Sequence, residues 1–108
     1  MTSFIPGPPS DSYFIVLDIK DYARTPARIA QVRARVIGTR GKTRRIIEDL
    51  TGAAMSVFGH TVSLIADDFQ LPIAQEAVEM LLKGSEHATV YRFLERKRGG
   101  LRIAEMGF

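Results

Sequence analysis

The 108-residue sequence contains no cysteine. This absence excludes a disulfide framework and a thiolate metal site. No apolar run approaches the roughly 20 residues of a membrane-spanning helix, and the first residues lack the charged and apolar regions of a signal peptide. We therefore expect a single cytoplasmic domain (nuclear or nucleolar in a eukaryote) that is monomeric, has no membrane partner and holds neither a metal ion nor a cofactor.

Acidic residues are also missing from one long window of the chain. Residues 24–45 carry eight of the fifteen Lys and Arg residues and no Asp or Glu, although the net charge of the whole chain is only +3. Such a window predicts a partner with repeated negative charge, most often a nucleic acid. Because solvated helix faces can show the same charges, the charge alone does not decide between these readings.

Periodicity and turn residues divide the rest of the chain into short elements. Residues 1–12 contain three of the five prolines and no periodic pattern, so we expect a flexible lead-in. Alternating or β-rich runs predict strands at 13–19, 54–58 and 61–66, with Gly59-His60 as a tight turn between the last two. Apolar spacing of three and four predicts helices over 26–37, 42–51 and 87–98, and another that follows Asp67 or Asp68 and ends before Gly84, with a tail at 99–108.

These elements predict an α+β fold, in which a three-stranded antiparallel sheet is covered on one face by three helices and a further helix is appended at the C-terminus. Asp67 or Asp68 is placed to cap the helix that contains Pro72. His60 and His87 have no acid or second ligand nearby in the sequence, so we expect them at the surface. No nucleophile and base are paired by the pattern, and we predict no catalysis.

The triplet Gly41-Lys42-Thr43 suggests a nucleotide-binding P-loop, but its context does not fit. A P-loop requires a glycine five residues before this glycine and a buried strand ahead of it. The required position is occupied by Val36, and the preceding residues predict an arginine-bearing helix. Nucleotide hydrolysis is therefore rejected.

What remains is a Gly38-Thr39-Arg40-Gly41 loop between two helices. Paired glycines allow a sharp turn and the close approach of another chain. The first N–H groups of the following helix are unsatisfied and carry the positive end of its dipole, which favours an anion. Basic side chains around the loop would surround a sugar-phosphate backbone, and apolar neighbours would offer a surface to bases.

The stretch VIGTRGKTRRIIEDLTGAAMSVFG resembles the core of a KH domain, with Gly38–Gly41 as its GXXG loop and the Thr51-Gly52 pair at the family's spacing. The order of elements is similar to the type I KH fold. This resemblance implies that the loop clamps the backbone of single-stranded RNA, in agreement with the charge pattern.

Residues 13–98 resemble more narrowly the second KH domain of the partner-of-Nob-one family of small-ribosomal-subunit assembly factors. The resemblance implies binding to rRNA near the 3′ end of the small-subunit precursor, and work beside ribosome-assembly proteins such as the endonuclease that matures that end. Members of this family usually carry an additional KH-like domain upstream.

The candidate RNA-binding residues share a position in or beside the loop: Arg33, Ile37, Gly38, Thr39, Arg40, Gly41, Lys42, Thr43, Arg44 and Ile47. Arg28 and Arg35 lie on the helix that leads into the loop and are further candidates for phosphate contacts. Two alternatives remain open. The domain could be a protein-interaction module that docks through Leu101, Ile103, Met106 and Phe108, or it could bind single-stranded DNA.

Overall fold

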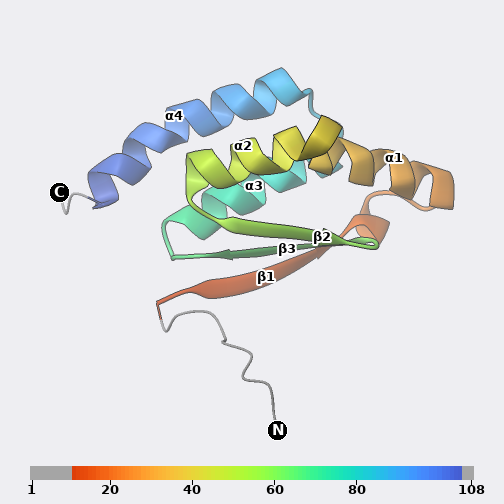
Figure 1. The fold of residues 1–108 in the computed structure, drawn as a ribbon, viewed down its shortest axis with the longest axis horizontal. Helices are drawn as coiled ribbons and strands as arrows, with labels where there is room; N and C mark the ends of the chain where they lie inside the picture. The colour runs from red at the N-terminus through yellow and green to blue at the C-terminus, as the bar shows by residue number, and fades with distance from the viewer. Residues whose placement is uncertain (1–10, 106–108) are drawn as a thin grey trace, which may run out of the picture.

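The computed structural model describes residues 11–105, with side chains described for residues 11–98. The predicted lead-in lies almost wholly outside this range. Figure 1 shows a single sheet with the helices gathered on one side of it. The elements follow in the order β1 (Tyr13–Asp18), a 3-10 turn (Ile19–Asp21), α1 (Pro26–Ile37), a loop turn (Thr39–Gly41), α2 (Lys42–Thr51), β2 (Ala54–Phe58), β3 (Thr61–Ala66), α3 (Gln70–Leu82) and α4 (His87–Glu105).

The three strands form an antiparallel sheet with the order β1-β3-β2. Val62 of the central strand lies between Leu17 of β1 and Val57 of β2. Alternation along β3 buries Val62, Leu64 and Ala66 on the face that the helices cover. The α+β fold with helices on one face of a three-stranded antiparallel sheet is therefore confirmed.

The ends of α1 follow from three residues. The Thr25 side chain accepts a hydrogen bond from the Arg28 N–H, Pro26 occupies the first turn, and Gly38 ends the helix at a positive φ. On the inner side of the helix Val32 and Val36 are buried, while Ile29 packs at the edge of the core. The packing of α1 against the core thus fixes the position of Gly38 at its C-terminal end.

The buried side of α2 is formed by residues that lie four positions apart. Thr43, Ile47 and Thr51 are buried, whereas Ile46 and Leu50 are only half-buried. A spacing of four residues places these three on one face. The two threonines tolerate burial because their hydroxyl groups are hydrogen-bonded to Tyr91 and to the Ile47 carbonyl.

The appended helix α4 is longer than the sequence pattern predicts. Val90, Phe93 and Leu94 are buried, as the pattern requires. The helix continues to Glu105, so residues 99–105 are helical rather than part of a tail, and residues 106–108 lie outside the described range. Within residues 11–105, no helix combines the length and the apolar character needed to cross a membrane.

Candidate nucleic-acid interface

The loop between α1 and α2 has an unusual backbone. Three of its four residues have positive φ: Gly38 (φ 77, ψ 167), Arg40 (φ 56, ψ 28) and Gly41 (φ 75, ψ 16). The Gly41 N–H donates to the Gly38 carbonyl at 3.1 Å and closes the turn. The loop is therefore a tight reversal of the chain that joins two helices.

The two glycines are required for different reasons. A Cβ atom on Gly38 would lie 2.3 Å from Thr43 Oγ1 and 2.6 Å from the Thr43 backbone nitrogen. A Cβ atom on Gly41 would meet no atom within 4 Å. Gly38 thus allows Thr43 to pack closely against the loop backbone. Gly41 is needed only because its backbone is left-handed, and the space beside its Cα atom is open.

The tip of the loop points toward solvent and toward the positive end of α2. Thr39 and Arg40 are exposed. The N-cap of α2 is Gly41, which offers no side chain to the first N–H groups, and the first turn of the helix holds no acidic residue. The helix dipole is therefore not balanced by a local carboxylate at this end, and Lys42 adds a cationic side chain there.

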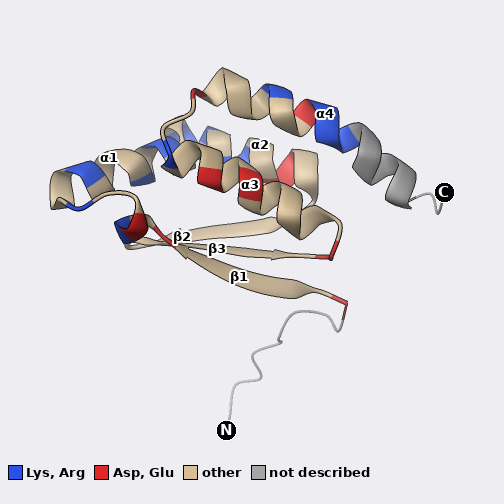
Figure 2. Cartoon of the chain, turned by 180° about the vertical axis from the view of Figure 1, so that it is seen from behind, with Lys and Arg blue, Asp and Glu red and all other residues tan. Residues whose placement is uncertain are grey.

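Six of the eight cations in the basic window, residues 24–45, are exposed. Figure 2 shows Lys and Arg along α1 and at its junction with α2, and acidic residues on α3. Arg33, Arg40, Lys42 and Arg45 are exposed. Among the described residues, the one ion pair that involves this window joins Arg44 to Glu48. An anionic chain that approaches the loop therefore meets a positive electrostatic potential.

Two arginines of the window have structural contacts that the sequence does not reveal. Arg35 donates to the carbonyls of Leu81, at 3.1 Å, and Ser85 at the end of α3. Because these contacts occupy the guanidinium, the expected phosphate contact of Arg35 is not supported. Exposed Arg28 donates to Gln31 at 3.2 Å, so it remains at the surface.

Arg44 connects α2 with the edge of the sheet. Its guanidinium donates to the Met55 carbonyl at 3.2 Å and to Glu48 at 3.4 Å, while Glu48 accepts the Met55 N–H at 2.9 Å. Both polar backbone groups of Met55 on β2 are thus satisfied by one pair of side chains. The Arg44 side chain remains 43% exposed and can still face an anion beside the loop.

Two predicted contact residues lie inside the protein. Thr43 is 2% exposed and Ile47 is fully buried. Their side chains do not reach the surface, so the prediction that they touch RNA is corrected. Ile37 is half-buried at the end of α1, next to Gly38, and retains a surface that a base could contact.

The sequence pattern misses two residues of α4 that reach the loop region. Tyr91 Oη lies 3.0 Å from Thr43 Oγ1, and His87 Nε2 donates to the Arg35 carbonyl at 2.9 Å. Both contacts join residues about fifty positions apart, for which a single sequence gives no local signal. The spacing of four between His87 and Tyr91 was the only available hint that they share a face.

His60 is partly exposed and has an acidic partner that is distant in the sequence. Its Nδ1 lies 2.9 Å from Asp18 Oδ1, and its carbonyl accepts the Ile19 N–H at 2.7 Å. The turn between β2 and β3 is thereby tied to the end of β1.

Asp67 accepts the N–H groups of Phe69 and Gln70 at the start of α3, which confirms the predicted cap of this helix.

The Asp18 contacts predict a dependence of stability on pH. The Lys20 N–H, followed by the His60 side chain, lowers the pKa of Asp18 below its usual 3.8. A lowered folded-state pKa contributes stability that is present above 3.8 and is lost as the pH falls through the folded value. We expect Asp18→Asn to be less stable than wild type above about pH 5, with a difference that shrinks at lower pH, as chemical denaturation would show. A difference independent of pH would contradict this assignment.

Comparison with known proteins identifies the fold family. Residues 13–99 match the model for the second KH domain of PNO1 proteins, described as a eukaryotic-type KH domain of type I. The chain belongs to this family. The predicted type I KH fold is therefore confirmed, and the Gly38–Gly41 loop lies within the matched residues.

Individual relatives agree with this membership. A KH domain-containing protein of Methanocaldococcus jannaschii is 50% identical over 96 residues, which cover 88% of this chain and 42% of the relative. The crystal structure of Dim2p from Pyrococcus horikoshii is 42% identical with a TM-score of 0.71, and the match covers 81% of this chain and 50% of that one.

Two further solved structures extend the comparison. The complex of a/eIF2alpha, aDim2p and rRNA from Pyrococcus horikoshii contains a chain that is 40% identical with a TM-score of 0.77, and the match covers 84% of this chain and 49% of that one. An Aeropyrum pernix protein is 33% identical with a TM-score of 0.84, over 90% of this chain and 52% of that one. The chain thus spans about half the length of these relatives.

Proposed function

We propose that this KH domain binds single-stranded RNA through the Gly38–Gly41 loop. The observation that carries the proposal is the loop itself, in which open space above Gly41 meets the uncapped, positively charged start of α2. Backbone N–H groups there would receive phosphate oxygens, because no side chain stands in the way. Exposed Arg40 and Lys42 would add charge on either side.

The proposed contact set follows from exposure. It comprises the predicted residues that the fold leaves at least partly accessible, namely Arg33, Ile37, Gly38, Thr39, Arg40, Gly41, Lys42 and Arg44. Positive residues would neutralise phosphates, and Ile37 would contact a base. Thr43 and Ile47 are excluded because they are buried.

We further propose that the RNA is rRNA and that the domain acts in small-subunit assembly, as a binder rather than an enzyme. The supporting observations are the membership of the PNO1 second-KH family and the 40% identity to an archaeal Dim2p whose structure is a complex with rRNA. The same family membership supports three finer proposals. The domain binds near the 3′ end of the small-subunit rRNA precursor, and the endonuclease that matures this end is a neighbouring protein. The domain acts where small subunits mature.

The salt dependence of binding tests the proposed clamp. A GXXG module contacts about four nucleotides, so about three or four phosphates would be neutralised. Log affinity against log salt should then have a slope of about −2 to −3 for a single strand. Fluorescence anisotropy with a short RNA from the 3′ end of small-subunit rRNA would measure it, with a DNA of the same sequence as a second arm.

Each outcome of this titration has a separate meaning. A slope indistinguishable from zero would contradict the phosphate clamp. A slope near about −6 would mean that all eight cations of the basic window, residues 24–45, contact the strand. Equal affinity for the DNA would show that the domain recognises single strands without reading the 2′-hydroxyl group.

A further inference from the structure

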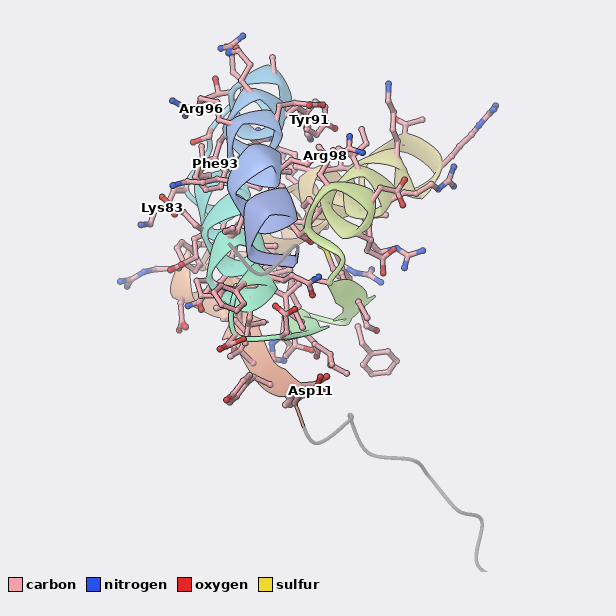
Figure 3. The ribbon with its side chains drawn as sticks, turned by 90° about the vertical axis from the view of Figure 1, so that its left-hand side faces the viewer. Asp11, Lys83, Tyr91, Phe93, Arg96 and Arg98 are labelled. Carbon is pink, nitrogen blue, oxygen red and sulfur yellow. The ribbon has the colours of Figure 1, made fainter. Side chains whose placement is uncertain are left out.

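The start of α4 contacts both helices that flank the loop. His87 lies in its first turn and donates to the Arg35 carbonyl near the end of α1. One turn later, Tyr91 contacts Thr43 near the start of α2. The two rings lie 6.1 Å apart on one face of α4, and Figure 3 shows Tyr91 on the side of α4 that faces α2.

The contact with Thr43 continues to the loop backbone. Thr43 Oγ1 occupies the position where a Gly38 side chain would otherwise begin, 2.3 Å from an ideal Cβ atom. Because Thr43 is 2% exposed, its hydroxyl group has no access to bulk water. Tyr91 is its described hydrogen-bond partner. A chain of contacts therefore runs from Tyr91 through Thr43 to Gly38.

Hydrogen bonds also hold the end of α1, which precedes the loop. The Arg35 guanidinium donates to the Leu81 and Ser85 carbonyls, while the Arg35 carbonyl accepts from His87. The last turn of α1 is thus fixed to the junction between α3 and α4. Both ends of the loop are held by residues near this junction, so the loop geometry depends on where α4 lies.

We propose that Tyr91 and His87 are positioning residues that hold the Gly38–Gly41 loop in the conformation that binds RNA. This inference rests on the proposed function and deepens it, since it makes α4 a support of the RNA-binding site rather than only an appended interaction helix. Neither residue touches RNA in this account. They act through Thr43 and through the Arg35 carbonyl.

The expected change in RNA affinity follows from the fraction of molecules whose loop is in the binding conformation. If the loop is free to leave its binding conformation, the apparent Kd rises in inverse proportion to the fraction that remains competent. One net hydrogen bond corresponds to a factor of about 2 to 13 in an equilibrium constant. Removal of the Tyr91 hydroxyl group should therefore weaken RNA binding about three- to tenfold.

The test compares Tyr91→Phe with wild type in the full chain, using a short fluorescein-labelled RNA from the 3′ end of small-subunit rRNA. Tyr22→Phe is the matched control, because Tyr22 is also half-buried and packs against the core near the start of α1. We expect Tyr22→Phe to bind within about twofold of wild type. Hydrogen exchange of the Gly41 amide should be faster in Tyr91→Phe and unchanged in Tyr22→Phe.

Thr43 variants separate positioning from a general loss of stability. Thr43→Val removes the hydroxyl group at constant shape and should weaken binding as much as Tyr91→Phe, whereas Thr43→Ser retains the hydroxyl group and should bind nearly as wild type does. Because both changes remove one contact, the Tyr91→Phe, Thr43→Val double variant should be no weaker than either single variant. Melting curves check that each variant is folded.

The outcomes distinguish this inference from the proposed function. If wild type binds the RNA and the folded Tyr91→Phe and Thr43→Val variants bind equally well, the positioning role is wrong and the proposed function stands. If Thr43→Ser binds as weakly as Thr43→Val, the hydroxyl contact is not the cause and the inference is also wrong. If wild type does not bind the RNA, the proposed function itself fails.

Discussion

Replacing Gly38 with alanine is expected to destabilise the domain by about 3 kcal/mol, which corresponds to a fall in melting temperature of roughly 12–20 °C. The backbone at Gly38 (φ 77, ψ 167) lies in a region that essentially only glycine occupies. In addition, the new Cβ atom would lie 2.6 Å from the Thr43 backbone nitrogen, which cannot move without shifting the start of α2.

Gly41→Ala provides the matched control, because it makes the same chemical change three residues away. Its backbone (φ 75, ψ 16) is left-handed, and its Cβ atom would meet nothing within 4 Å. The expected loss is therefore about 1 kcal/mol, the usual cost of a left-handed alanine. Thermal denaturation of both variants tests the difference. Equal losses would contradict the close packing of Gly38 against Thr43.

Local sequence signals predicted much of the architecture. Proline and glycine mark the ends of α1, and alternation identifies β3, because these signals act between near neighbours along the chain. The loop was also predictable, since two glycines beside a run of basic residues leave few structural alternatives. The family resemblance then related this loop to RNA.

Contacts between distant parts of the chain could not be predicted in the same way. Thr43 was predicted to bind RNA because it lies beside the loop, yet it is buried and hydrogen-bonded to Tyr91, which is 48 positions later. Arg35 was interpreted as a phosphate ligand because it lies in the basic window, yet it binds carbonyls at the end of α3. Charge patterns indicate the partner but not which side chains remain free to meet it.

The second large expected effect concerns the two residues between the loop glycines. The Thr39→Asp, Arg40→Asp double variant should remain folded and lose measurable binding to single-stranded RNA. Both positions are exposed, and aspartate tolerates the left-handed backbone of Arg40. Two carboxylates before α2 would also complement its dipole, so stability should change by no more than about 0.5 kcal/mol.

The loss of binding follows from charge. The double variant removes one positive charge and adds two negative ones where the phosphates must approach, so repulsion replaces attraction. Thr89→Asp, Arg92→Asp is a matched control, because it makes the same substitutions and the same change in charge on two exposed residues of α4. This control should keep RNA affinity within a few fold of wild type if the site is the loop.

The most direct test of the central claim is therefore one titration of the same labelled single-stranded RNA with wild type and both double variants, each checked for its melting temperature. The claim that the Gly38–Gly41 loop is the RNA-binding site predicts binding by wild type and by the α4 control, and none by the folded loop variant. Unaltered affinity in the folded Thr39→Asp, Arg40→Asp variant would remove the loop from the binding site and contradict the proposed function.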